Sequence, residues 1–128
     1  MRILLDTHVL LWAASTPERL GASQQDLCCA EQRLISAASA WELAIKKGLG
    51  RLDLATDVCS WLHRAVRELR AQSLSITGDH AAAVEHLPPV HRDPFDRLLV
   101  AQAIHEGAVL LTADRRLLPY GEMVRLVS

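Results

Sequence analysis

Short apolar runs alternate with helical patterns along this sequence, and no other feature limits the possible fold as strongly. The runs cover residues 3–5, 34–35, 74–76, 108–111 and 123–127, and each is too short for a helix but suits a buried strand. Strands that alternate with helices favour a parallel sheet with helices on both faces. We therefore predict an α/β domain with a central, mostly parallel sheet of about five strands.

Helical signals fill the intervals between these runs. A Ser-x-x-Glu sequence and a later Asp-Pro pair are typical helix starts. One segment carries apolar residues at i, i+3, i+4, i+7, i+8 and i+11, which is one face of an amphipathic helix. The predicted helices and their expected caps are 9–14 (Thr7), 39–47 (Ser39), 58–69, a short helix begun by Asp79 and ended by Pro88–Pro89, and 94–107 (Asp93).

Length and charge narrow the class of protein. The chain has 128 residues, the size of one domain, so we expect residues 1–128 to form a single unit. Fourteen Lys and Arg against fifteen Asp and Glu give a net charge of −1, which excludes the overall basic field of a simple polyanion-coating protein. No apolar run approaches the roughly 20 residues that span a bilayer, and the N-terminus has no cleavage-site pattern. We expect a cytoplasmic protein without membrane contact.

Three cysteines, at positions 28, 29 and 59, add little chemistry to this sequence. Their odd number and the lack of a C-x-x-C spacing argue against a disulfide framework and against a zinc ribbon. We expect small buried or half-buried thiols.

Carboxylates from four separate segments are expected at the carboxyl edge of the sheet. Asp6 follows the first strand and Asp114 comes shortly after the fourth, while Glu42 and Asp96 lie in the first turns of helices that begin near this edge. Carboxylates placed together repel one another unless a cation lies between them. Oxygen ligands suit Mg²⁺ or Mn²⁺. A site with one or two such ions fits phosphodiester hydrolysis by a metal-activated water.

Each of these acids also has a simpler interpretation, in which it only stabilises a helix or a turn. Such roles are common for acids near helix starts. The alternatives are a cap for Asp6, Asp93 or Asp114, a partner of Ser39 or Lys46 for Glu42, and a favourable charge on the helix dipole for Asp96.

Several segments resemble a known family. They are Asp6-Thr7, the Trp41-Glu42-Leu43-Ala44-Ile45-Lys46 segment, the segment from His91 to Leu99 with its Asp-Pro-Phe-Asp-Arg sequence, and Leu111-Thr112-Ala113-Asp114. In this order they resemble the PIN-domain family and, within it, the VapC-type toxins of bacterial type II toxin–antitoxin operons. The resemblance implies a three-layer α/β/α fold and a Mg²⁺- or Mn²⁺-dependent endoribonuclease that cuts tRNA or another structured RNA. It also implies a cognate antitoxin as partner and a homodimer.

The same resemblance implies roles for individual residues. Asp6, Glu42, Asp96 and Asp114 match the catalytic acids of the family, with Glu42 reaching the metal through water or a second ion. Thr112 matches a polar residue beside the last acid, where it would orient water. Asp93 and Arg97 match the motif in supporting roles.

Basic and aromatic residues near the acids are candidates for contacts with other molecules. Lys46, Arg92, Arg115 and Arg116 stand beside the acidic segments, where they could hold RNA phosphates. Exposed arginines at helix ends explain most of them equally well. Trp12, on the first short helix, is the candidate for an antitoxin contact. Trp41 and Trp61 are expected in the core, and His8 beside the pocket.

Other classes of protein share a small acidic α/β domain. An aspartyl-phosphate phosphatase usually has a second Asp two residues after the first, where this chain has His8. A receiver-like signalling module needs a phosphoacceptor Asp after a middle strand, where Ser36 stands. No H-x-x-x-H or E-x-x-H spacing supports a zinc site. The alternative that we keep is a non-catalytic PIN-like or receiver-like Mg²⁺-binding module for protein interactions.

Overall fold

The computed structural model describes residues 1–128 and contains a five-stranded sheet in the order β3-β2-β1-β4-β5. All four strand pairs are parallel, which confirms the predicted α/β class. The first strand therefore lies at the centre of the sheet. The strands are β1 (Arg2–Leu5), β2 (Gln32–Ser36), β3 (Gln72–Leu74), β4 (Val109–Thr112) and β5 (Val124–Leu126).

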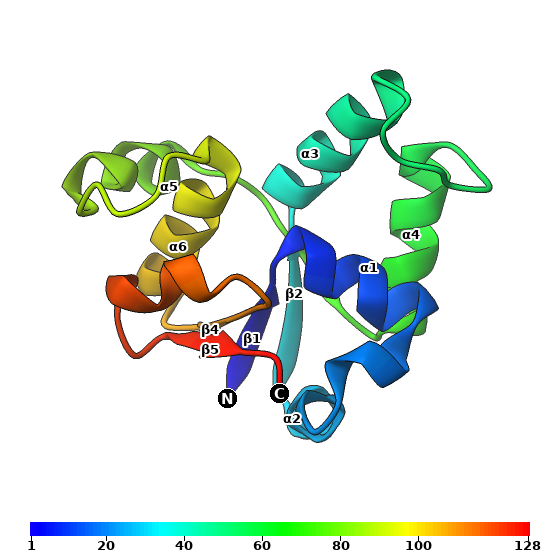
Figure 1. Cartoon of the computed structure of the whole chain (residues 1–128), viewed down its shortest axis with the longest axis horizontal. Coiled ribbons are helices and arrows are strands. Elements are labelled where there is room, and N and C mark those ends of the chain that lie inside the picture. Colours follow the sequence, from blue (N-terminus) through cyan, green and yellow to red (C-terminus); the bar gives the residue numbers. More distant parts are fainter.

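Helices cover both faces of this sheet (Figure 1). One face carries α1, α2 and α4, the other carries α5 and α6, and α3 starts at the carboxyl edge between them. Neither α2 nor the preceding 3₁₀ turn η1 is predicted from the sequence. The helices are α1 (Thr7–Ser15), α2 (Ser23–Cys29), α3 (Ala37–Gly48), α4 (Val58–Glu68), α5 (Gly78–Ala83) and α6 (Pro94–Glu106), and the 3₁₀ turns are η1 (Pro17–Leu20), η2 (Val84–His86) and η3 (Arg115–Tyr120).

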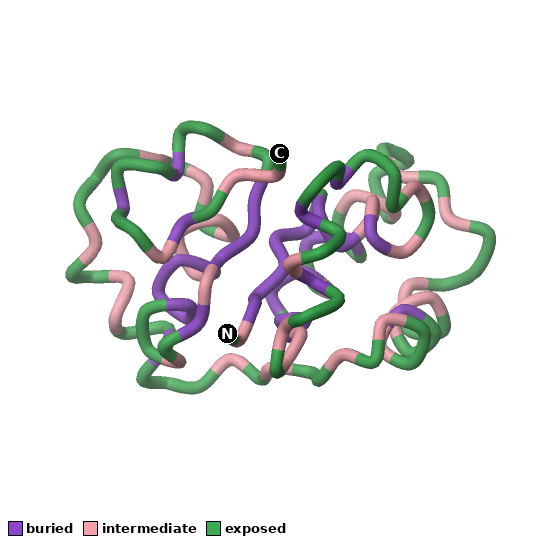
Figure 2. Tube along the Cα trace, turned by 90° about the horizontal axis from the view of Figure 1, so that it is seen from below, coloured by how far each residue is buried: buried purple, intermediate pink, exposed green.

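Two separate apolar clusters show that the domain has three layers. Alternate residues of a strand point to opposite faces, so Ile3 and Leu5 pack against α1 and α4, whereas Leu4 packs against α6. The buried segments accordingly concentrate in the strands and in the inner turns of the helices (Figure 2). No helix is both long and apolar enough to cross a membrane.

Three predicted caps are wrong, and two of them for the same reason. In the structure Asp6, Ser36 and Thr77 cap α1, α3 and α5, in place of Thr7, Ser39 and Asp79. For α1 and α3 the strand passes into the helix without a loop. The last extended residue can then accept a bond from the first helical turn. The helices therefore begin two residues earlier than the periodicity indicates.

The last helix follows its sequence signals closely. Asp93 caps α6 by accepting the backbone N–H groups of Phe95 and Asp96, at 2.8 and 3.2 Å. Pro94 occupies its first position and Gly107, at φ 64°, ends it in the left-handed conformation. Burial is deep only in the middle of this helix, because Ile104 is 50% exposed.

Two smaller expectations about the core are wrong. All three cysteines are exposed, because they lie on the outer faces of α2 and α4. Trp41 is 59% exposed, since it projects from α3 beside Phe95 rather than into the sheet. Trp61 is half-buried against the cluster under α1 and α4, close to expectation.

Candidate acidic active site

A pocket of about 380 Å³ opens at the carboxyl edge of the sheet. The structure brings the four predicted acids together there, from β1, α3, α6 and the turn after β4. Asp93 joins them as a fifth acid. The other lining residues are Thr7, His8, Trp12, Lys46, Ala113 and Arg116.

Asp6 lies deepest and is held by two donors. Its Oδ1 accepts the backbone N–H of Val9 at 2.8 Å, and its other carboxylate oxygen accepts the hydroxyl of Thr112. Burial raises the pKa of Asp6 above its usual value, although these hydrogen bonds act in the opposite direction. The cap role and the place in the pocket therefore belong to the same carboxylate.

Glu42 is buried on the first turns of α3 and binds neighbours on two helices. Thr7, at the start of α1, donates its hydroxyl to Oε1 at 2.7 Å, and Lys46 lies 2.9 Å from Oε2. The expected ion pair with Lys46 is thus present. The expected capping box is absent, because Ser39 lies inside the helix, where its Oγ is 3.1 Å from the hydroxyl oxygen of Thr7.

Asp96 is the least neutralised acid of the pocket. Burial raises its pKa to about 7, and the nearby negative charges of Asp93 and Asp6 add to the shift. Its side chain is 22% exposed and so still open to the pocket. A carboxyl group with this pKa is only partly ionised at neutral pH, and a bound metal would favour its ionised form.

Asp114 is the opposite case. Its Oδ1 accepts the backbone N–H and Nε of Arg116, at 2.9 and 3.0 Å, and its Oδ2 accepts Nη2 of the same guanidinium at 2.9 Å. Arg116 therefore holds the pKa of Asp114 well below its usual range. The carboxylate also caps η3, so its simpler interpretation and its place in the pocket both hold.

Thr112 is fully buried and links two of the acids. Its hydroxyl donates to Asp6 and accepts the backbone N–H of Asp114 at 3.0 Å. The hydroxyl therefore orients the carboxylate of Asp6.

Arg97 does not face the pocket. Its guanidinium donates to the backbone oxygens of Val84 and Pro88, at 3.2 and 3.1 Å, and to the hydroxyl of Tyr120 at 3.1 Å. It also approaches the carbonyl of His91 at 3.4 Å. Arg97 thus fastens the segment between η2 and α6 to the body of the domain.

His91 contacts two acids of the pocket, and the sequence did not predict it as a site residue. Its Nε2 lies 3.2 Å from Asp114 Oδ2 and 3.4 Å from Asp96 Oδ2, and its side chain is only 7% exposed. The one available signal was its position two residues before the N-cap Asp93. Its closeness to Asp114 comes from tertiary structure and has no trace in the local sequence.

The four predicted phosphate contacts fall into two pairs. Lys46 and Arg116 line the pocket but are ion-paired with Glu42 and Asp114. Arg92 and Arg115 are exposed beside it. Trp12 also lines the pocket, with the guanidinium carbon of Arg19 4.3 Å from the centre of its ring.

The donors of this pocket suit a hard divalent cation. Carboxylate oxygens are the ligands that Mg²⁺ and Mn²⁺ prefer, and a partly open pocket leaves room for the waters that Mg²⁺ retains. Burial and the neighbouring acids Asp93 and Asp6 raise the pKa of Asp96, and a bound cation would offset this repulsion. The acids therefore fit such an ion.

Comparison with known proteins identifies similar sequences. The sequence model of the PIN domain matches residues 3–122. The chain is also 39% identical over 117 residues to "Ribonuclease VapC22" of Mycobacterium tuberculosis, a match that covers 90% of this chain and 88% of that protein.

Solved structures share the fold at low sequence identity. VapBC2 from Rickettsia felis, bound to a DNA fragment from their promoter, has a TM-score of 0.75 at 16% identity, with full coverage of both chains. DNA-bound VapBC from Salmonella typhimurium has a TM-score of 0.70 at 14% identity, covering 100% of this chain and 99% of that one. A toxin–antitoxin complex from Klebsiella pneumoniae has 0.67 at 18%, covering 96% and 95%.

Proposed function

Since this chain belongs to the PIN-domain family, we propose that it is a metal-dependent endoribonuclease and the toxin of a type II toxin–antitoxin pair. The observation that carries the proposal is the pocket that Asp6, Glu42, Asp96 and Asp114 share at the carboxyl edge of the sheet. The ribonuclease name of the 39% identical relative supports the activity. In this proposal the protein acts on RNA in the cytoplasm.

Asp6, Asp96 and Asp114 would hold Mg²⁺ or Mn²⁺ directly, and Glu42 would act through water or a second ion. The bound ion supplies a water of lowered pKa and neutralises charge on the leaving oxygen. Thr112 keeps the carboxylate of Asp6 in one orientation through its hydroxyl. Thr7 does the same for Glu42 from the start of α1. Asp93 fixes the first turn of α6, and with it the backbone of Asp96.

The substrate in this proposal is tRNA or another structured RNA. Arg92 and Arg115 are exposed beside the acids, and Lys46 and Arg116 lie at the pocket itself. Cations on several sides of the acids would hold phosphates that flank the scissile one. The ion pairs of Lys46 and Arg116 keep their charges close to the reaction centre.

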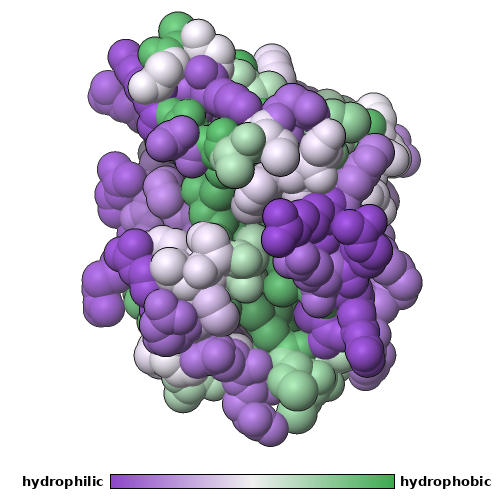
Figure 3. Space-filling view, turned by 90° about the vertical axis from the view of Figure 1, so that its right-hand side faces the viewer, coloured by the Kyte–Doolittle hydropathy of each residue, from purple (hydrophilic) through white to green (hydrophobic).

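The proposed antitoxin would dock on an apolar hollow beside α4. Figure 3 shows apolar surface inside a depression on this side of the molecule. The hollow has a volume of about 470 Å³ and lies between α1, α4 and the segment before α4, with Leu11, Leu52, Leu54 and Trp61 in its wall. Apolar side chains of an antitoxin segment would fill it. Trp12, on α1 beside the hollow and at the pocket, is the proposed contact that joins the two regions.

A second copy of the chain is proposed on the outer face of α3. Trp41, Ile45 and Leu49 are all at least 39% exposed and stand four residues apart, so they form one apolar stripe. Phe95 extends the stripe, with its ring centre 5.1 Å from that of Trp41. A homodimer would bury this stripe.

The test is an incubation of purified protein with total cellular RNA in Mg²⁺, in Mn²⁺ and in EDTA. We expect discrete fragments with wild type in either metal, none in EDTA, and none with Asp96→Asn. The matched control is Asp79→Asn, an exposed acid on α5, which should cut like wild type. Metal binding without cleavage of any RNA would favour the non-catalytic binding module.

A further inference from the structure

The orientation of the His91 ring is fixed from behind by the backbone. The backbone N–H of Asp93 donates to Nδ1 of His91 at 3.0 Å. A nitrogen that accepts a hydrogen bond carries no proton, so the neutral ring has its proton on Nε2. His91 therefore presents an N–H donor, and no free electron pair, to the pocket.

Two carboxylates from different elements meet this donor. Asp114, after β4, has its Oδ2 3.2 Å from Nε2, and Asp96, on α6, has its Oδ2 3.4 Å away. The N–H of Nε2 thus donates to Asp114 and lies close to Asp96, between two acids that would otherwise repel each other. The distance between the two carboxylates is set by a residue of a third segment.

The segment that carries His91 is itself anchored. Arg97 approaches the carbonyl oxygen of His91 at 3.4 Å and donates to that of Pro88 at 3.1 Å. The same guanidinium donates to the hydroxyl of Tyr120, the buried last residue of η3. His91 is therefore held at its backbone carbonyl, at Nδ1 and at Nε2, so its ring has a fixed orientation.

We propose that His91 is a positioning residue that holds Asp96 and Asp114 in one arrangement and thereby increases the affinity of the pocket for a divalent cation. The proposal rests on the proposed function of the pocket as a metal site. His91 does not bind the ion or the RNA in this mechanism. It acts through the two carboxylates, as donors behind metal ligands commonly do.

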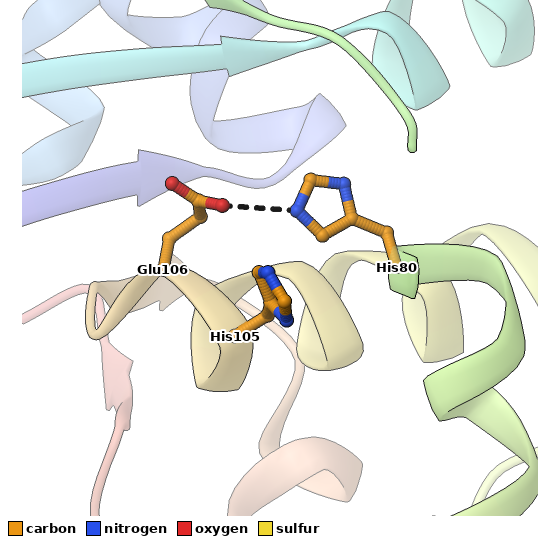
Figure 4. A group of neighbouring side chains, drawn as sticks. All are labelled: His80, His105 and Glu106. Carbon is orange, nitrogen blue, oxygen red and sulfur yellow. Dashed lines mark hydrogen bonds and ion pairs between the residues drawn. The ribbon is translucent and has the colours of Figure 1, made fainter. Parts of the chain in front are cut away.

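A second histidine in the same domain is the natural control. The Nδ1 of His80 accepts the backbone N–H of Thr77 at 3.1 Å, and its Nε2 donates to Glu106 at 3.0 Å (Figure 4). His105 stands next to this pair, so the cluster has the composition of a metal site. However, His80 has no free electron pair, and Arg2 lies 3.5 Å from Glu106 and neutralises it. The same hydrogen-bond arrangement around His80 therefore only stabilises the fold.

The experiment is calorimetric titration of Mn²⁺ into the purified protein without RNA. His91→Ala should bind Mn²⁺ about 10- to 100-fold more weakly than wild type, the usual effect of losing a donor behind a metal ligand. His91→Gln, which retains an N–H donor at similar reach, should recover most of the affinity. His80→Gln should bind like wild type.

A further variant covers the case in which His91→Ala does not fold. His91→Asn keeps an acceptor for the backbone of Asp93 but its amide is too short to reach the carboxylates. It should melt near wild type and still bind Mn²⁺ weakly. If it binds Mn²⁺ as wild type does, the proposal is wrong.

Two more results would overturn the proposal. The first is tighter Mn²⁺ binding by His91→Ala, which would mean that His91 competes with the ion. The second is a directly bound nitrogen in the electron paramagnetic resonance spectrum of Mn²⁺ on wild type, which would make His91 a ligand. Metal binding is measured without RNA, so a wild type that binds Mn²⁺ but cuts nothing contradicts only the proposed nuclease.

Discussion

A histidine with the same hydrogen-bond arrangement lies at each end of α6, but the charges around the two histidines differ. At each end a backbone N–H occupies Nδ1 of a histidine, and Nε2 faces a carboxylate: His80 faces Glu106, and His91 faces Asp96 and Asp114. At the C-terminal end of α6, Arg2 neutralises Glu106, the single acid there. At the N-terminal end several acids share one pocket, and Arg116 binds only one of them, Asp114.

The pKa values record this difference. The hydrogen bond from His80 lowers the pKa of Glu106, whereas burial among other acids raises that of Asp96 to about 7. A histidine–carboxylate pair is therefore no sign of a metal site by itself. What distinguishes the pocket is negative charge that its own side chains leave uncompensated.

The largest difference between the two ends should appear in RNA cleavage. Asp6→Asn or Asp96→Asn should lower the metal-dependent rate by about 10²- to 10³-fold, the scale of losing one charged group in a preorganised site. Glu106→Gln should leave the rate unchanged. Fragment yield per unit time, measured on one RNA at saturating Mn²⁺, checks both. An equal loss of cleavage rate in all three variants would contradict the proposed difference between the two ends of α6.

The two ends should also respond to pH with opposite sign. In EDTA the native state keeps a proton on Asp96 that the unfolded chain loses above about pH 4, so this group makes the protein less stable as pH rises towards 7. Each unit of pKa difference corresponds to about 1.4 kcal/mol. Glu106, with a lowered pKa, stabilises the fold above about pH 4.3 and loses this effect as pH falls.

Urea unfolding at pH 5 and pH 8 measures this contrast. Asp96→Asn should be more stable than wild type in EDTA, and the gain should be larger at pH 8 than at pH 5. Glu106→Gln should be less stable than wild type at both values. A gain for Asp96→Asn that does not change with pH would contradict the assigned pKa.

Loss of the buried histidine should affect stability alone. His80→Ala removes the buried ring whose Nδ1 accepts the N–H of Thr77 and the amide of Gln102. Losing a buried side chain and its hydrogen bonds should lower the free energy of unfolding by about 1–3 kcal/mol. The check is chemical denaturation, with Mn²⁺ affinity of the folded fraction expected to stay at the wild-type value.

The smallest change in stability is expected from loss of the ion pair between Arg2 and Glu106 at the C-terminal end of α6. Arg2→Gln removes the cation beside Glu106, but both side chains are partly exposed. Pairs of this kind contribute about 0.2–1 kcal/mol. Thermal melting in low salt should show a small decrease that shrinks in high salt. A large loss would mean that the contact of Arg2 with the backbone of Glu106 matters more than the charge.

Much of this architecture could be predicted from the sequence. Period and caps placed every strand within about two residues, and α6 almost completely, because Asp93-Pro94 and Gly107 act on their own neighbours. The convergence of Asp6, Glu42, Asp96 and Asp114 followed from the rule that carboxyl ends of parallel strands share an edge. These are local signals combined with one topological rule.

The rest depended on contacts between distant segments. Thr7 donates to Glu42 across 35 residues, and His91 reaches Asp114 across 23. Arg97 lies next to Asp96 yet turns away to fasten another segment, which its motif position does not reveal. Helix α2 was missed because its seven residues show no apolar period.

The most direct test of the contrast between the two ends is a calorimetric titration of Mn²⁺ into wild type, Asp96→Asn and Glu106→Gln. We predict that wild type and Glu106→Gln bind the ion with equal affinity, while Asp96→Asn binds it at least about 10-fold more weakly. Binding that survives in Asp96→Asn but disappears in Glu106→Gln would place the ion at the wrong end of α6 and contradict the proposed active site.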